Sequence, residues 1–242
     1  MVNIDLEYFR TVQNAMGFDT ERDVLLAEEK LRLREELETS ICCENALRNG
    51  EPQKFIVTAS KQKNKCDIVA FPDEPLYAGD YIDCYGEKWI VTEVSPVNTL
   101  QLSGVMLQCN FLLRFQNGTS DIIERWAVLD SGVYSTTIAG EKPVFYPNAQ
   151  YKVWLPLDED TRLLHVDKRF AVEKITDQKG DAILSVYRFT AHDGISESNG
   201  SGAHLLVMKA KSDEYKPGAD NIDLMVCNYI SGIGGTQDDG WY

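Results

Sequence analysis

The fold is decided by residues 81–94, which read Tyr-Ile-Asp-Cys-Tyr-Gly-Glu-Lys-Trp-Ile-Val-Thr-Glu-Val. Apolar and polar side chains alternate over residues 81–85 and again over residues 89–94, and Gly86-Glu87 supplies a turn between the two runs. Alternation with a period of two is typical of a half-buried β-strand. Two such runs around a glycine turn predict a β-hairpin.

The same character extends outward in both directions, as short β-type runs bounded by Gly, Pro, Asn or Asp. No helical pattern comes between them, so we expect a mainly β, antiparallel fold of the barrel or sandwich kind. Asn117-Gly118 predicts a second hairpin turn, between the two runs nearest to it. The further runs are 55–58, 66–70, 106–115, 122–128, 152–156, 170–173, 183–189, and a final pair at 205–208 and 224–229.

The first fifty residues instead predict an α-helical segment. A variant capping box, Thr20-x-x-Asp23, opens its second helix. Asn49-Gly50-Glu51-Pro52 is expected to end the helical region. An apolar stripe on an otherwise polar helix can cover a core or dock on a neighbouring subunit, and both remain open. The stripe residues, which are candidate partner contacts, are Leu26, Leu33, Leu37 and Ile41.

These patterns divide the 242 residues into four segments. Residues 1–50 form the N-terminal helical segment, and residues 51–130 form a β-barrel-like domain. Residues 131–230 form a second β-rich domain or a continuation of the first. Residues 231–242 are Gly-rich and acidic and predict a flexible C-terminal tail.

Composition excludes several classes of protein. The net charge of −14 disfavours sequence-specific DNA binding, because phosphate contacts need Lys and Arg. An acidic surface could instead line a channel through which DNA slides, although a plain acidic cytosolic protein fits the charge equally well. No apolar run approaches the ~20 residues that span a bilayer, so no membrane partner is expected. The N-terminus lacks the features of a secretory signal.

The motifs of common chemical sites are also missing. The 6 Cys and 3 His do not have metal-ligand spacing, and reduced, buried thiols are the simpler expectation. The acids at residues 158–160 fit a solvated turn better than a metal or phosphatase site. His192-Asp193 is an isolated pair. We therefore expect no enzyme activity, catalytic residue, metal or cofactor.

The tryptophans divide into two groups. Trp89, Trp126 and Trp154 stand in predicted strands and are expected to fill the core. The fourth lies beside another aromatic residue, after the acidic tail. Leaving such a pair in water is unfavourable, so docking on a partner is one interpretation and folding back onto its own domain is the other. These two candidate contacts are Trp241 and Tyr242.

Several stretches together resemble one group of proteins. Residues 75–82, Pro-Leu-Tyr-Ala-Gly-Asp-Tyr-Ile, followed by Trp-Ile-Val-Thr-Glu-Val at 89–94, resemble the "Gly-Asp, then Trp-x-Val" hairpin of phage neck proteins. Residues 104–115 are similar to the segment ending in Cys-Asn-x-x-Leu-(Lys/Arg)-aromatic in structural proteins of tailed bacteriophages of Gram-positive hosts. Later pieces match the same pattern in order, so the resemblance covers roughly residues 20–190. They are 155–161, 167–170 and 187–190.

This resemblance implies a virion structural protein of the neck, a head–tail connector or head-closure (stopper) component. It implies a homo-oligomeric ring that binds portal or adaptor and tail proteins, with DNA passing through its channel without sequence-specific binding. The protein would be assembled in the host cytoplasm and end in the virion. The resemblance transfers no catalytic residues.

Three alternatives remain. One is another phage tail component, either a tail terminator or a baseplate protein. A second, of a different class, is a ligand- or glycan-binding β-domain that uses exposed Tyr and Trp. A third is a hydrolase using Asp158, Asp160 or Asp193.

Overall fold

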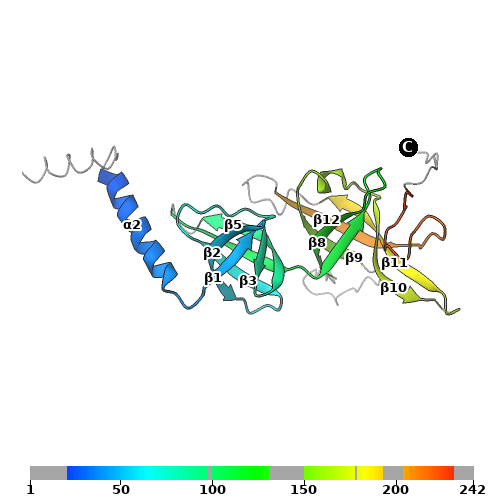
Figure 1. Ribbon diagram of the computed structural model, residues 1–242, viewed down its shortest axis with the longest axis horizontal. Coiled ribbons are helices and arrows are strands. Elements are labelled where there is room, and N and C mark those ends of the chain that lie inside the picture. The colour runs from blue at the N-terminus through cyan, green and yellow to red at the C-terminus, as the bar shows by residue number, and fades with distance from the viewer. Residues whose placement is uncertain (1–20, 97–99, 131–149, 178, 193–203, 232–242) are drawn as a thin grey trace, which may run out of the picture.

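The computed structural model describes residues 21–96, 100–130, 150–177, 179–192 and 204–231. One helix projects from a closed β-barrel, and a second, six-stranded antiparallel sheet lies on the other side of that barrel (Figure 1). The expected fold class, mainly β and antiparallel with an N-terminal helix, is confirmed.

Helix α2, Glu21–Glu38, is shorter than the helical region that we expected. Residues 43–48 are not helical and form strand β1, and the Asn49-Gly50 pair is the turn of a β-hairpin with φ of 50° and 90°. Asn-Gly accepts positive φ at both positions and therefore suits this tight turn better than the end of a helix. The first expected helix lies outside the described residues.

Six strands close the barrel in the order β1-β2-β3-β6-β5-β4. Every neighbouring pair is antiparallel, and β1 closes the ring by pairing with β4. The predicted hairpin is present as β4–β5, but its turn lies at Tyr85-Gly86, one residue before the expected Gly86-Glu87, with φ of 57° and 77°. The strands are β1 Cys43–Arg48, β2 Glu51–Ala59, β3 Lys65–Ala70, β4 Tyr81–Cys84, β5 Glu87–Pro96 and β6 Leu102–Gln108.

Alternate residues of these strands fill the barrel. Phe55, Ile68, Ile82 and Met106 come from four different strands and are completely buried. Since strand side chains alternate between the two faces, the period-two pattern of the sequence directly produces this core. The buried residues of this barrel core all lie between Ala46 and Met106.

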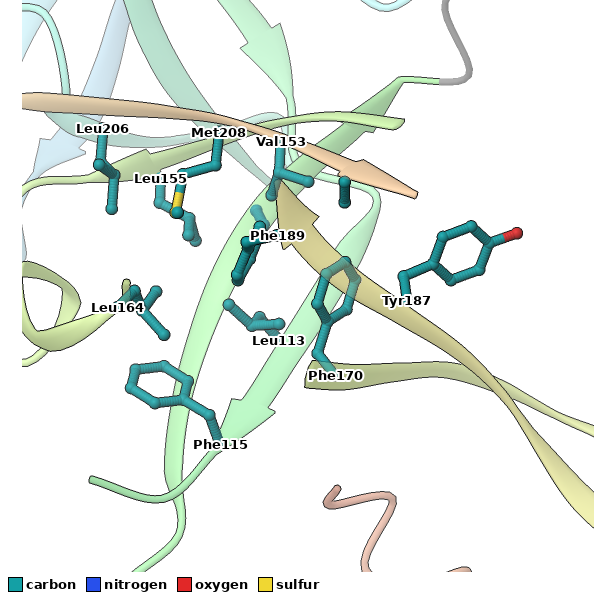
Figure 2. Packing of buried hydrophobic residues seen from close by; sticks show 12 residues of the cluster. Leu113, Phe115, Val153, Leu155, Leu164, Phe170, Tyr187, Phe189, Leu206 and Met208 are labelled. Atoms are coloured by element: carbon teal, nitrogen blue, oxygen red, sulfur yellow. The ribbon is translucent and has the colours of Figure 1, made fainter. Parts of the chain in front are cut away.

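The second sheet follows the order β10-β11-β12-β9-β8-β7. Its edge strands approach each other, because the ring centroids of Phe111 in β7 and Phe170 in β10 are 6.2 Å apart. Figure 2 shows Phe170 and Phe189 within this core, stacked with their centroids 4.7 Å apart. The elements are β7 Phe111–Phe115, β8 Ile123–Asp130, β9 Gln150–Pro156, the 3₁₀ turn η1 Thr161–Leu163, β10 Arg169–Thr176, β11 Ala182–His192 and β12 Leu205–Asp213.

Two expected strands differ from the structure. Residues 106–115 do not form one strand, because the chain passes at Cys109-Asn110 from β6 in the barrel to β7 in the second sheet. Residues 224–229 form turns with one isolated bridge, Asn221 to Val226. Positive φ at Met225 and Asn228 interrupts the extended backbone that a strand there would need.

The barrel and the second sheet therefore meet in the middle of the predicted segment 51–130. Strands β7 and β8 fall in that segment but belong to the second sheet, together with strands from 131–230.

An apolar cluster joins the two parts, with Ile90 from the barrel packed among Val128, Trp154 and Val207 of the second sheet. The linking dipeptide is also held: the Cys109 amide donates to the Lys88 carbonyl over 2.8 Å. We call this region the junction.

At the junction, the backbone of the barrel closely approaches the backbone of the second sheet. Gly79 has φ of +99°, and a Cβ on it would lie 1.9 Å from the carbonyl oxygen of His204, just before β12. Only glycine combines that φ with so close an approach. The loop before β4 is thereby packed directly against the second sheet.

Candidate functional site

Helix α2 is attached to the barrel by polar contacts. Lys30 Nζ lies 2.6 Å from Asp73 Oδ1, and Arg34 donates to the Pro72 carbonyl over 3.1 Å. Lys54 Nζ lies 3.0 Å from Glu38 Oε1. Exposed pairs of this kind contribute only about 0–1 kcal/mol each. These contacts therefore contribute little free energy to holding the helix on the barrel.

No residue of α2 belongs to an apolar cluster among the described residues. Its predicted stripe residues Leu26, Leu33 and Leu37 are half-buried. Ile41 follows the end of the helix, so it does not continue the stripe, and it is 98% exposed. The helix thus leaves apolar side chains available, including Leu31, which is 63% exposed.

A hollow of about 610 Å³ opens beside the junction. Residues from β1, β2, the β4–β5 hairpin and β8 line it. We call it the aromatic groove and define it by Ala46, Leu47, Pro52, Tyr85, Lys88 and Trp126.

Two aromatic rings at this groove are open to solvent. Tyr85 is 59% exposed and Trp126 is 41% exposed, and Leu47 beside them is 41% exposed. The expectation that Trp126 fills the core is wrong, whereas Trp89 and Trp154 are buried. In β8 the buried Ala127 points into the second core, so the preceding residue lies on the opposite face.

The wall of the aromatic groove is well fixed. The hydroxyl of Tyr81 donates to the Trp126 carbonyl, and Lys88 Nζ lies 5.2 Å from the centroid of the Tyr81 ring. Burial raises the pKa of Tyr81, so this hydroxyl stays protonated as a donor. Burial also raises the pKa of Cys109 to about 12, so its thiol is no nucleophile at neutral pH.

A separate hollow lies next to the aromatic groove, beside helix α2. This second hollow has a volume of about 380 Å³, and Arg34 and Glu38 of α2 line it. It shares Asn45, Ala46 and Pro52 with the aromatic groove. The β1–β2 hairpin therefore forms a common wall between the two hollows.

Of the acids at 158–160, Asp158 and Asp160 form salt bridges with an arginine of the same chain. Arg125 Nε lies 2.7 Å from Asp158 Oδ2, and the same guanidinium also donates to Asp160. Burial would raise the pKa of Asp158, but the Thr161 amide and Arg125 outweigh it and the pKa is lowered. The Asp158 carboxylate is therefore ionised at neutral pH, and both Asp158 and Asp160 are already paired with Arg125.

The remaining candidates are scattered. His192 ends β11, and its neighbour Asp193 lies outside the described residues, as do Trp241 and Tyr242. Among described residues, no group of three or more His, Cys, Asp and Glu is placed to hold a metal ion. In the same part of the chain no helix is long and apolar enough to cross a membrane. The described cysteines are free thiols.

The fold and these surfaces define a β-barrel protein with a projecting helix and a second β-sheet. No family model, no curated protein and no solved structure matches the chain.

Proposed function

We propose that the protein is a non-enzymatic virion structural protein of a tailed bacteriophage. In this proposal it is a head–tail connector or head-closure component of the neck, and it forms a ring with copies of itself around the DNA channel. Its other partners are portal or adaptor and tail proteins. The assignment to the phage neck is supported by the series of motifs that resemble neck proteins in the same order. The proposal that the protein assembles with partners is supported by helix α2.

The helix supports assembly because it has little to pack on within its own chain. In proteins, most of the stability of a helix comes from tertiary packing of its apolar side chains. Helix α2 has polar tethers and internal Arg32–Glu29 and Arg32–Glu36 pairs, but no part in a described core. A neighbouring subunit that covers Leu33 and Leu37 would supply the missing apolar contact.

A ring needs two different patches on each subunit, since its interfaces are head-to-tail. The projecting helix suits one patch, and the β-body suits the other. The net charge of −14 disfavours tight binding to phosphate, as passage of DNA through the channel requires.

The experiment compares Leu33→Ser/Leu37→Ser with the matched control Glu28→Ser, which changes an exposed residue of the same helix. Each protein is mixed with portal or adaptor protein, and its mass is measured by light scattering. We expect the double variant to lose the ring-sized species, and the control to keep it.

Mass spectrometry of purified virions gives an independent result. The proposal predicts the protein in mature particles. A protein that stays monomeric with those partners and is absent from virions would contradict the proposal.

Particles made without the protein separate the neck from other positions in the virion. A neck-closure component predicts filled heads that leak DNA. Tails of irregular length would indicate a tail terminator, and particles with complete necks and tails but defective baseplates would indicate a baseplate protein.

The aromatic groove favours a second candidate, a glycan-binding β-domain. Tyr85 and Trp126 offer exposed rings on which a sugar can stack, and Asp83 and Asn45 offer polar partners in the same hollow. A glycan array should then give hits that Trp126→Ala abolishes. An array without hits removes this candidate.

A further inference from the structure

The aromatic groove exposes apolar surface, while the sequence beyond the described residues carries an apolar pair without an assigned contact. Residues 232–242 read Gly-Ile-Gly-Gly-Thr-Gln-Asp-Asp-Gly-Trp-Tyr. We propose that Trp241 and Tyr242 of the same chain occupy the aromatic groove. This inference is independent of the phage proposal, because it uses only the groove and the position of the last described residues.

The groove suits two aromatic side chains. Its volume of about 610 Å³ falls within the range of sites that bind small organic groups. Tyr85 and Trp126 present rings, and aromatic rings pack favourably in offset or edge-to-face arrangements. Leu47 and Pro52 add aliphatic surface to the lining.

The chain before residue 232 is anchored on the second sheet, at the end of β7 that lies away from the groove. Ile230 is held to Gln116 by two hydrogen bonds, from the Ile230 amide over 2.8 Å and to its carbonyl over 3.2 Å. Gln116 follows the end of β7, and Leu112 of β7 lies opposite Trp126 in β8. The distance along the strand from Gln116 to Leu112 is about 13 Å.

The intervening sequence is long enough for this path. An extended chain from Ile230 to Trp241 spans at most about 36 Å. That length exceeds the separation along β7 with ample slack for a path over the surface. Between Ile233 and Trp241 the sequence has no large apolar side chain, so the aromatic pair is the part suited to an apolar groove.

The groove could be occupied by the chain's own tail or by the tail of a second copy, and the short tether favours the chain's own tail. A tethered segment meets its own groove at a millimolar effective concentration. A tail from another molecule reaches that concentration only in a concentrated sample or an assembly. In the dilute protein we therefore expect docking within one chain.

The experiment uses a labelled peptide of residues 232–242 and a chain that ends at Ser231. Fluorescence anisotropy should show the peptide binding to the shortened chain. Its apparent affinity for the full chain should be at least about ten-fold weaker, because the full chain's own tail competes for the groove. Trp126→Ala in the shortened chain should weaken binding by about ten-fold, as should Trp241→Ala/Tyr242→Ala in the peptide.

Glu124→Ala is the matched control, because it lies two residues from Trp126 on the same face of β8 and does not line the groove. It should leave the affinity within about two-fold. Absence of peptide binding to a folded shortened chain would overturn the inference. Binding that survives Trp126→Ala would also overturn it.

A second measurement covers the case in which the shortened chain does not fold. In the full chain labelled with 5-fluorotryptophan, Trp126→Phe identifies the ¹⁹F resonance of Trp126. Trp241→Ala/Tyr242→Ala should shift that resonance in a monomeric sample, and an unmoved resonance contradicts docking. A shift that appears only as the molecular mass rises with concentration would assign the tail to a second copy and overturn docking within one chain.

Discussion

At the scale of single residues, the most constrained position is Gly79. It combines a positive φ with a close approach to the His204 carbonyl, so it fixes how the barrel meets the second sheet. Arg169 is a second such position, because its guanidinium is 4% exposed and binds the completely buried carboxylate of Asp220. That pair holds the segment after β12 onto the sheet.

Gly79→Ala should destabilise the protein by about 3 kcal/mol, because the new methyl group would lie 1.9 Å from a backbone oxygen on a strained φ. Urea denaturation measures the change. Gly86→Ala is the control, since its φ of +77° is also positive but nothing lies within 4 Å of the added Cβ. The control should cost about 1 kcal/mol, and equal losses for both variants would contradict the steric explanation.

Asp220→Ala should cost about 3–5 kcal/mol, because it leaves the buried guanidinium of Arg169 without its main counter-charge. Chemical denaturation followed by circular dichroism provides the measurement. Glu38→Ala removes the exposed pair with Lys54 and should cost less than about 1 kcal/mol. Similar losses from the two variants would show that burial of the ion pair is not what matters.

Asp158 predicts a pH dependence. Its pKa in the folded protein lies below the ordinary value of 3.8, so the unfolded chain takes up its proton first as the pH falls. The stability that this group contributes is therefore complete above its ordinary pKa and is lost as the pH falls through the lowered one. Stability measured from pH 6 to pH 3 should fall less steeply in Asp158→Asn; an unchanged slope would exclude this contribution.

At the scale of elements, the contacts between helix α2 and the barrel contribute little to the stability of either. The helix adds polar pairs to the loop at Pro72, Asp73 and Glu74 but no side chain to the barrel core. The core of the barrel is therefore complete without the helix, and in the proposed assembly the helix would be the part that contacts a partner.

A chain lacking residues 1–38 should consequently keep its Tm within about 2 °C of the full chain, because the contacts that the described residues 21–38 make with the barrel are polar and largely exposed. Differential scanning calorimetry measures this. The matched comparison is Phe55→Ala, which empties a completely buried position and should lower the Tm by many degrees. A comparable fall on removal of the helix would show that it packs more strongly than its contacts indicate.

Sequence patterns predicted the elements whose cause is local. The hairpin around Tyr85-Gly86 follows from alternation and turn chemistry, and so does the β7–β8 hairpin. Strand β1 is not predicted because Asn49-Gly50, which directly follows it, also suits the end of a helix, and the helical pattern before it extends to Ile41. The role of Trp126 was missed because its exposure depends on where the barrel lies, which is a tertiary effect.

At the scale of the whole molecule, the junction unites the two β-structures. The apolar cluster around Ile90, Trp154 and Val207 takes residues from both, so neither can lose its packing without affecting the other. The link at Cys109-Asn110 was invisible in the sequence, where a continuous apolar run suggested one strand. Asn110 holds β8 through two hydrogen bonds with Leu129, of 2.8 and 2.9 Å.

We therefore expect one cooperative unfolding transition for the barrel and the second sheet. Calorimetric and van't Hoff enthalpies should agree in a protein without aggregation. Ile90→Ala should lower the single transition without splitting it, because this side chain is completely buried in the shared cluster. Two separate transitions in the unmodified protein would contradict a shared core.

The close contact between Gly79 and His204 also has a mechanical consequence. A peptide linker of free rotation would act as a hinge and absorb a pull on one end of the molecule as bending. Here backbone lies against backbone beside the link, so bending of the barrel relative to the second sheet would meet direct steric resistance.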